Sequence, residues 1–155
     1  MTKEQLFHTF PNQVKKFLTD GRDRDEILLN ICTLLHDSVD VYDWVGFYIA
    51  DPNKERELYL GPYVGPETDH TRIPFGVGIC GQVAESHETF VVDDVTKQDN
   101  YLSCSINVKS EIVVPILKNG HFVAQLDIDS NTIAAMDEID QRVLEEICDM
   151  LADLF

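Results

Sequence analysis

The chain has 155 residues, of which 44% are hydrophobic and 26% are charged, and this length and composition predict one globular domain and exclude a disordered chain. Its 12 Lys and Arg residues against 28 Asp and Glu residues give a net charge of −16, which argues against nucleic acid or an anionic membrane surface as a partner. Because the sequence contains no apolar segment of signal-peptide or membrane-spanning length, we expect a cytoplasmic protein with reduced thiols.

The N-terminal part of the chain is predicted to form two helices. Residues 3–19 and 24–39 are expected to be helical. In the second segment Ile27, Ile31 and Leu34 recur at three- and four-residue steps, which is the period of an amphipathic helix.

Strands and a first long loop are predicted next. Aromatic and β-branched residues at 44–50 indicate a buried strand, and a second strand is expected around 58–60. The Gly- and Pro-rich residues 61–76 predict an irregular loop. A short helix over 79–86 and a strand over 89–92 follow.

The C-terminal part is predicted to contain a hairpin and a helix. Residues 93–110 are polar and indicate a second long loop. Asn119-Gly120 lies between two apolar segments and is a strong hairpin signal, and the apolar period over 139–151 predicts an amphipathic helix. This order of elements favours an α+β fold in which helices cover one side of an antiparallel sheet. Long loops in a small domain are usually functional, so both loops are candidates for the site.

Two motifs resemble known ligand sites but lack their context. Residues 76–81 match the GxGxxG pattern of dinucleotide-binding proteins, yet no buried strand leads into them. Asp127, Asp129 and Glu138 are spaced like ligands of an EF-hand calcium loop, but Thr132 stands where that loop needs Gly. Neither motif is expected to bind its ligand.

The four cysteines fall into two pairs. Cys32 and Cys148 lie in predicted helices beside apolar residues, and we expect them to be buried core residues. Cys80 begins a short helix after a Gly-rich turn, where backbone N–H groups can stabilise a thiolate, and Cys104 lies in the second long loop. Both are candidates for redox chemistry; the alternative is two incidental loop thiols.

Three acidic residues are predicted to meet at one end of the hairpin. Glu111 begins its first strand, and Asp127 and Asp129 share one face near the end of its second strand. Mutual repulsion and burial would raise at least one pKa, so the cluster could hold an ammonium group and donate a proton. The alternative is a solvated acidic rim. Trp44 and Tyr48, four residues apart on one strand face, could form an aromatic wall or simply pack in the core.

An ordered set of motifs resembles the free methionine-(R)-sulfoxide reductases, which are single-domain GAF proteins. The resemblance covers residues 40–131. The matching segments are WVGFY (44–48), LGPYVG (60–65), TRIPFGVGICG (71–81), VVDDV (91–95), the loop that carries Cys104, SEIVVPI (110–116) and LDIDS (126–130).

This resemblance implies that residues 1–155 form one GAF domain. Its N-terminal helices would occupy residues 1–39, its sheet and pocket loops 40–131, and its C-terminal helix 137–155. The fold would be a central antiparallel sheet with the N- and C-terminal helices packed on one face and two long loops around a pocket.

The resemblance also implies a reaction. Cys104 matches the catalytic cysteine, whose thiolate would attack the sulfoxide sulfur and become a sulfenic acid. Glu111, Asp127 and Asp129 match substrate-site residues that bind the amino acid and help protonate the sulfoxide oxygen. Trp44 and Tyr48 match the aromatic residues around the methyl group.

The cysteine set departs from the family pattern at one position. Cys80 matches the family's second cysteine, but His70 stands where the main resolving cysteine is expected. A sulfenic acid on Cys104 would then be resolved by Cys80 or by an external thiol. The family implies a homodimer reduced by thioredoxin, and we expect no cofactor and no metal.

Two alternatives to a reductase remain at this point. The chain could be a binding or sensing module that keeps the pocket and binds a small zwitterion without efficient catalysis. In the second alternative, His70, Cys80 and Cys104 would form a metal or redox-sensing site.

Overall fold

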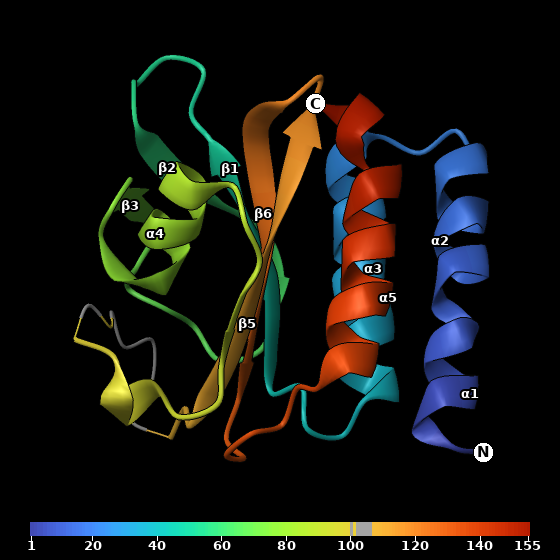
Figure 1. The fold of residues 1–155 in the computed structure, drawn as a ribbon. Coiled ribbons are helices and arrows are strands. Elements are labelled where there is room, and N and C mark those ends of the chain that lie inside the picture. Colours follow the sequence, from blue (N-terminus) through green and yellow to red (C-terminus); the bar gives the residue numbers. More distant parts are fainter. Residues whose placement is uncertain (100, 102–106) are drawn as a thin grey trace.

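A six-stranded antiparallel sheet is the centre of the protein in the computed structural model, which describes residues 1–99, 101 and 107–155 (Figure 1). The sheet order is β3-β2-β1-β6-β5-β4. The strands are β1 (Trp44–Ala50), β2 (Glu57–Val64), β3 (Arg72–Pro74), β4 (Phe90–Val92), β5 (Ser110–Lys118) and β6 (His121–Ser130). The helices are α1 (Lys3–His8), α2 (Phe10–Thr19), α3 (Arg24–Ser38), α4 (Gly78–Ser86) and α5 (Glu138–Met150), with 3₁₀ turns at Val95–Lys97 and Ala152–Leu154.

Helices cover the two faces of the sheet unequally (Figure 1). Helices α3 and α5 pack directly on one face, and α1 and α2 form an outer layer against α3 and α5. Helix α4 lies on the opposite face. The predicted α+β architecture, with N- and C-terminal helices on one side of an antiparallel sheet, is confirmed. None of the helices in the described part of the chain is long and apolar enough to cross a membrane.

The predicted helix over residues 3–19 is wrong in one respect, because the structure contains two helices separated at Thr9. Pro11 lies in the first turn of α2. Proline has no backbone N–H and cannot continue the hydrogen-bond ladder of the preceding helix. The Thr9 hydroxyl instead donates to the backbone carbonyl of Leu6 at 2.7 Å and closes α1.

The predicted irregular loop over residues 61–76 is also wrong in part. Strand β2 continues to Val64, and β3 pairs with its beginning. The register between β1 and β2 shifts between Gly46 and Tyr48, which face Tyr63 and Leu60. Gly61 and Pro62 therefore form a bulge opposite Phe47, and a bulge is one of the places where a sheet tolerates proline.

The β5–β6 hairpin is confirmed as predicted. Asn119 and Gly120 both have positive φ values, 53° and 80°, as the favoured two-residue hairpin turn requires. The register pairs Glu111 with Asp129 and Val113 with Asp127. The hairpin therefore carries the acidic residues to the end of the sheet that is remote from the turn.

The two faces of the sheet contribute to separate hydrophobic clusters. Val45, Phe47 and Ile49 of β1 pack with the helices of the thicker side. Trp44 and Tyr48 belong to the cluster on the α4 side. Cys32 and Cys148 are 0% and 1% exposed within the larger cluster, so the prediction that they are core residues is confirmed.

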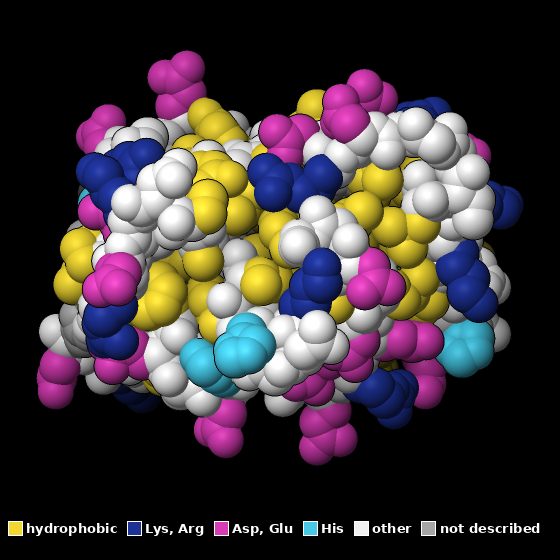
Figure 2. All heavy atoms as spheres, turned by 90° about the horizontal axis from the view of Figure 1, so that it is seen from above, with side chains coloured by type: hydrophobic (Ala, Val, Ile, Leu, Met, Phe, Trp, Pro, Cys, Tyr) yellow, Lys and Arg dark blue, Asp and Glu magenta, His cyan; other side chains and the backbone are white. Residues whose placement is uncertain are grey.

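The negative charge is not gathered into one patch on the face shown in Figure 2. Acidic and basic side chains alternate there around exposed apolar atoms.

Candidate active site

Three carboxyl groups meet on the α4 side of the sheet, as predicted. Glu111, Asp127 and Asp129 are 5%, 1% and 2% exposed. Burial raises the pKa of all three, and their mutual repulsion raises the pKa of Glu111 and Asp129 further. Glu111 is hydrogen-bonded to both aspartates, and these hydrogen bonds also raise the pKa of Glu111. The cluster is buried, so the alternative of a solvated acidic rim is wrong.

Sheet register explains why these groups converge. Asp129 lies between Trp44 of β1 and Glu111 of β5, its partners on either side. Asp127 lies opposite Gly46 of β1, a position with no side chain to cover the carboxyl group. All the carboxyls come from two adjacent strands, so their spacing is determined by backbone hydrogen bonds and not by a flexible loop.

Cys80 lies above this cluster at the start of α4. Its Sγ donates a hydrogen bond of 3.4 Å to Oδ2 of Asp127. Cys80 is only 6% exposed. Burial raises the pKa of the Cys80 thiol well above its ordinary value, and the charges of Asp127 and Glu111 raise it further. This contradicts the expectation that the helix start stabilises a thiolate here, because burial and nearby anions outweigh the backbone N–H groups.

Trp44 and Tyr48 share one face of β1, as predicted from their spacing. Their rings stack with centroids 6.2 Å apart, and Tyr63 also stacks on Trp44, with centroids 5.3 Å apart. Trp44 Nε1 donates to the carbonyl of Pro66 at 3.0 Å, and the Tyr48 hydroxyl donates to the carbonyl of His70 at 2.8 Å. Sequence reasoning missed Tyr63 because its segment was expected to be a loop.

Two small cavities border the acidic cluster. One, of about 10 Å³, is lined by Tyr48, Cys80, Glu111 and Asp127 together with Ile73 and residues 77–79. The other, of about 60 Å³, is lined by Trp44, Asp129, Asp43, Pro66, Asn107, Val108 and Asn131. Every predicted site residue that the structure describes therefore lines one cavity or the other.

Cys104, the predicted nucleophile, lies outside the described residues. The same loop continues to Asn107 and Val108, which line the larger of these two cavities. The backbone N–H of Lys109 donates a hydrogen bond of 2.8 Å to the carbonyl oxygen of Ser130, at the end of β6. The loop that carries Cys104 thus ends beside Asp129.

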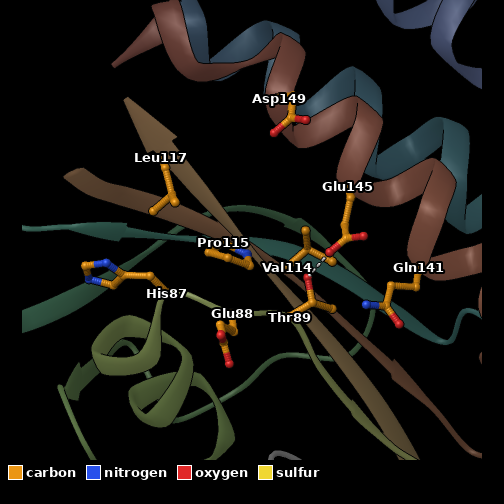
Figure 3. Close-up of a pocket in the computed structure, with 9 residues that line it drawn as sticks. All are labelled: His87, Glu88, Thr89, Val114, Pro115, Leu117, Gln141, Glu145 and Asp149. Carbon is orange, nitrogen blue, oxygen red and sulfur yellow. Dashed lines mark hydrogen bonds between the residues drawn. The ribbon is translucent and has the colours of Figure 1, made fainter. Parts of the chain in front are cut away.

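A larger volume than either of these cavities lies elsewhere. A surface groove of about 610 Å³ runs between the end of α4, β5 and α5 (Figure 3). Figure 3 shows that Thr89 and Glu145 point toward each other across it, with a hydrogen bond of 2.7 Å. None of the predicted site residues lines this groove.

The matched family is the GAF domain family, over residues 23–153. The chain belongs to it. GAF domain-containing protein A of Dictyostelium discoideum is 36% identical over 150 residues, which cover 97% of this chain and 92% of that protein. The free methionine-R-sulfoxide reductase of Saccharomyces cerevisiae is 37% identical over 115 residues, which cover 74% of this chain and 63% of that protein.

A solved structure supports the same relationship for this GAF domain. The free methionine-R-sulfoxide reductase of Neisseria meningitidis, solved in complex with its substrate, superposes with a TM-score of 0.93 at 36% identity. The match covers 100% of this chain and 91% of that one. The resemblance inferred from the sequence motifs is therefore confirmed.

The glycines of residues 76–81 have a structural role in the GAF domain. Gly76 has a φ of 86°, and a Cβ on Gly81 would lie 2.7 Å from the carbonyl oxygen of Pro74. These glycines make the tight turn from β3 into α4. Because β3 is antiparallel to β2, the parallel strand pair of a dinucleotide-binding fold is absent from this part of the sheet.

Proposed function

We propose that this GAF domain reduces free methionine (R)-sulfoxide to methionine. The observation that carries the proposal is the contact of Glu111 with Asp127 and Asp129 beside the aromatic wall of Trp44 and Tyr48. Buried carboxyl groups suit the ammonium group of a free amino acid, and a carboxyl that retains its proton can protonate a sulfoxide oxygen. The similar proteins named as reductases support the same reaction.

The proposed chemistry begins with the Cys104 thiolate, which attacks the sulfoxide sulfur while a carboxyl of the cluster protonates the oxygen. The sulfur–oxygen bond of the substrate breaks, the oxygen stays on Cys104 as a sulfenic acid, and methionine leaves as the thioether. The thiol is oxidised by two electrons and the substrate is reduced by two, so the step needs no cofactor.

Regeneration of Cys104 requires a second thiol. Cys80 would condense with the sulfenic acid to a disulfide and release water, and a dithiol such as thioredoxin would reduce that disulfide to two thiols. The raised pKa of Cys80 makes it a slow nucleophile at neutral pH. We therefore propose that an external thiol can also reduce the sulfenic acid directly. We further propose that the protein is a homodimer and is located in the cytoplasm.

The test is a chiral amino-acid assay with racemic free methionine sulfoxide. It is run once with dithiothreitol and once with thioredoxin and its reductase. We expect loss of the R epimer alone, abolished by Cys104→Ser and retained by Cys32→Ser, whose thiol lies in the core on the far side of the sheet. Equal activity of wild type and Cys104→Ser, or loss of the S epimer, would refute the proposal.

A second candidate function is supported by His70. The position expected to carry the main resolving cysteine holds His, and one relative is named only as a GAF domain-containing protein. Such a protein would bind a small zwitterion in the same pocket without turnover. It would show a ligand-induced rise in melting temperature with free amino acids or sulfoxides and no loss of either epimer.

A further inference from the structure

Cys80, Glu111 and Asp127 present three potential ligand atoms to one point. Sγ of Cys80 and one oxygen of each carboxyl lie within 4.8 Å of one another. A tetrahedral zinc ion with a Zn–S distance of about 2.3 Å and a Zn–O distance of about 2.0 Å separates sulfur and oxygen ligands by about 3.5 Å. The separation of Cys80 Sγ from Asp127 Oδ2 is 3.4 Å, so these two atoms already have the spacing of a ligand pair.

A second observation also points to a ligand. Oδ1 of Asp127 and Oδ1 of Asp129 are buried and have no hydrogen-bond partner within residues 1–99, 101 and 107–155. A buried carboxylate oxygen without a partner carries a large desolvation cost, which a cation removes. No Lys or Arg of the described chain forms an ion pair with these aspartates or with Glu111.

The cavity beside these atoms has the size of an ion. Its volume of about 10 Å³ is close to the space that a single water molecule needs. Amino acids are much larger, so they cannot fill it. The larger cavity of about 60 Å³ lies beside Asp129, where there is more room for a substrate ammonium group.

From this arrangement we propose that Cys80, Glu111 and Asp127 form a site for a divalent transition-metal ion, best fitted by Zn²⁺. A thiolate with two carboxylates suits zinc, whereas Mg²⁺ and Ca²⁺ require oxygen ligands throughout. The site differs from the one considered from the sequence, because His70 is not part of this group among the described residues. Binding itself does not depend on the reductase activity.

Metal binding would inhibit the proposed reaction, and this part of the inference rests on the proposed function. The ion would hold Cys80 as a ligand and so remove it as a resolving thiol. It would also displace the proton of Glu111 and neutralise the charge that attracts an ammonium group. Zn²⁺ bound to Glu111 and Asp127 would therefore weaken the binding of a free amino acid at the adjoining Asp129.

The first test uses Co²⁺ as a spectroscopic substitute for Zn²⁺, added anaerobically to chelator-treated full-length protein. A thiolate ligand gives a near-ultraviolet charge-transfer band that saturates at one equivalent and disappears when Zn²⁺ is added. We expect the band in wild type and in Cys32→Ser, and not in Cys80→Ser. Absence of the band in wild type, or its persistence in Cys80→Ser with loss in Cys104→Ser, would overturn the site.

The second test measures Zn²⁺ affinity by equilibrium dialysis and needs no activity. Asp127→Asn and Glu111→Gln keep the side-chain shape and should each weaken binding by more than about 100-fold, since loss of an outer partner alone costs about 10- to 100-fold. Circular dichroism verifies that each variant is folded. Unchanged affinity in both folded variants would contradict the proposal, whether or not wild type reduces a sulfoxide.

Discussion

The hydroxyl of Tyr48 donates a hydrogen bond of 2.8 Å to the backbone carbonyl of His70. This bond connects the central strand β1 to the segment between β2 and β3. Trp44 makes the equivalent bond to Pro66 in the same segment, at 3.0 Å. The two aromatic residues of the site therefore also hold in place the backbone around His70, the position where the resemblance predicts the main resolving cysteine.

Tyr48→Phe should destabilise the protein and loosen this segment. The change removes one partly buried hydrogen bond, which contributes about 0.5–1.5 kcal/mol to the free energy of unfolding. Urea denaturation measures the loss. Tyr59→Phe is the matched control, because the Tyr59 hydroxyl has only a long contact of 3.4 Å to Arg24. Equal stability losses in the two variants would show that the bond to His70 is not special.

Gly46→Ala should displace the indole of Trp44. A Cβ at position 46 would lie 2.7 Å from Cζ3 of Trp44 and 2.7 Å from Cβ of Tyr63, and overpacking of this kind costs about 1–3 kcal/mol. Trp44 is the single tryptophan of the chain, so intrinsic fluorescence reports on it alone. We expect a shifted emission maximum and a lower melting temperature; an unchanged spectrum would contradict the stacking described.

The stability of the protein should depend on pH through Glu111. Its pKa is raised in the folded state by burial and by the two aspartates, so above about pH 4.3, where an unfolded Glu loses its proton, the folded state binds more protons. The stabilising contribution of Glu111 is complete below that pH and is lost as pH rises through the folded pKa.

Glu111→Gln removes this dependence. The free energy of unfolding of the variant, relative to wild type, should increase as pH rises above about 4.3 and the wild-type carboxyl ionises. Urea denaturation at a series of pH values measures this difference, and the exposed Glu88→Gln serves as control. A constant or falling difference would show that Glu111 does not keep its proton in the folded state.

Gln125→Met should stabilise the fold. Gln125 is 0% exposed on β6, between Tyr48 and Pro115 in the neighbouring strands, and within the described chain neither end of its amide has a hydrogen-bond partner. Replacing an unsatisfied buried amide with an apolar side chain of similar shape recovers about 1–3 kcal/mol. A higher midpoint in urea is the expected result, and a lower one would show that the amide is satisfied.

The convergence of the acidic residues was predictable from local rules. Asn119-Gly120 sets the hairpin turn, and the two-residue period of a strand places Asp127 and Asp129 on one face. Together they bring Glu111 beside that pair, as the structure shows. Both rules concern neighbours in the chain or directly across a two-residue turn, which is why the sequence was sufficient.

Two wrong predictions, for the end of β2 and for the pKa of Cys80, depend on contacts between residues that are distant in the sequence. The end of β2 was missed because Pro62 is a local signal against a strand, whereas its pairing with β1 is a tertiary interaction. The pKa of Cys80 was expected to fall because of the nearby helix start. Burial of the thiol in the folded protein reverses that expectation, and so does Asp127, which is 47 positions away in the sequence but lies 3.4 Å from the Cys80 sulfur.

The register of β6 couples the site to the core. Ala124, Leu126 and Ile128 pack under the helices, while Asp127 and Asp129 face α4. A shift of the β6 register by one residue would place both carboxyl groups in the hydrophobic core and the apolar side chains in the pocket. Because burying the carboxyl groups and exposing the apolar side chains would cost free energy, only one register of β6 is stable. One strand register therefore determines both the packing of the core and the position of the carboxyl groups, so a chain that has folded its core has also formed the acidic cluster.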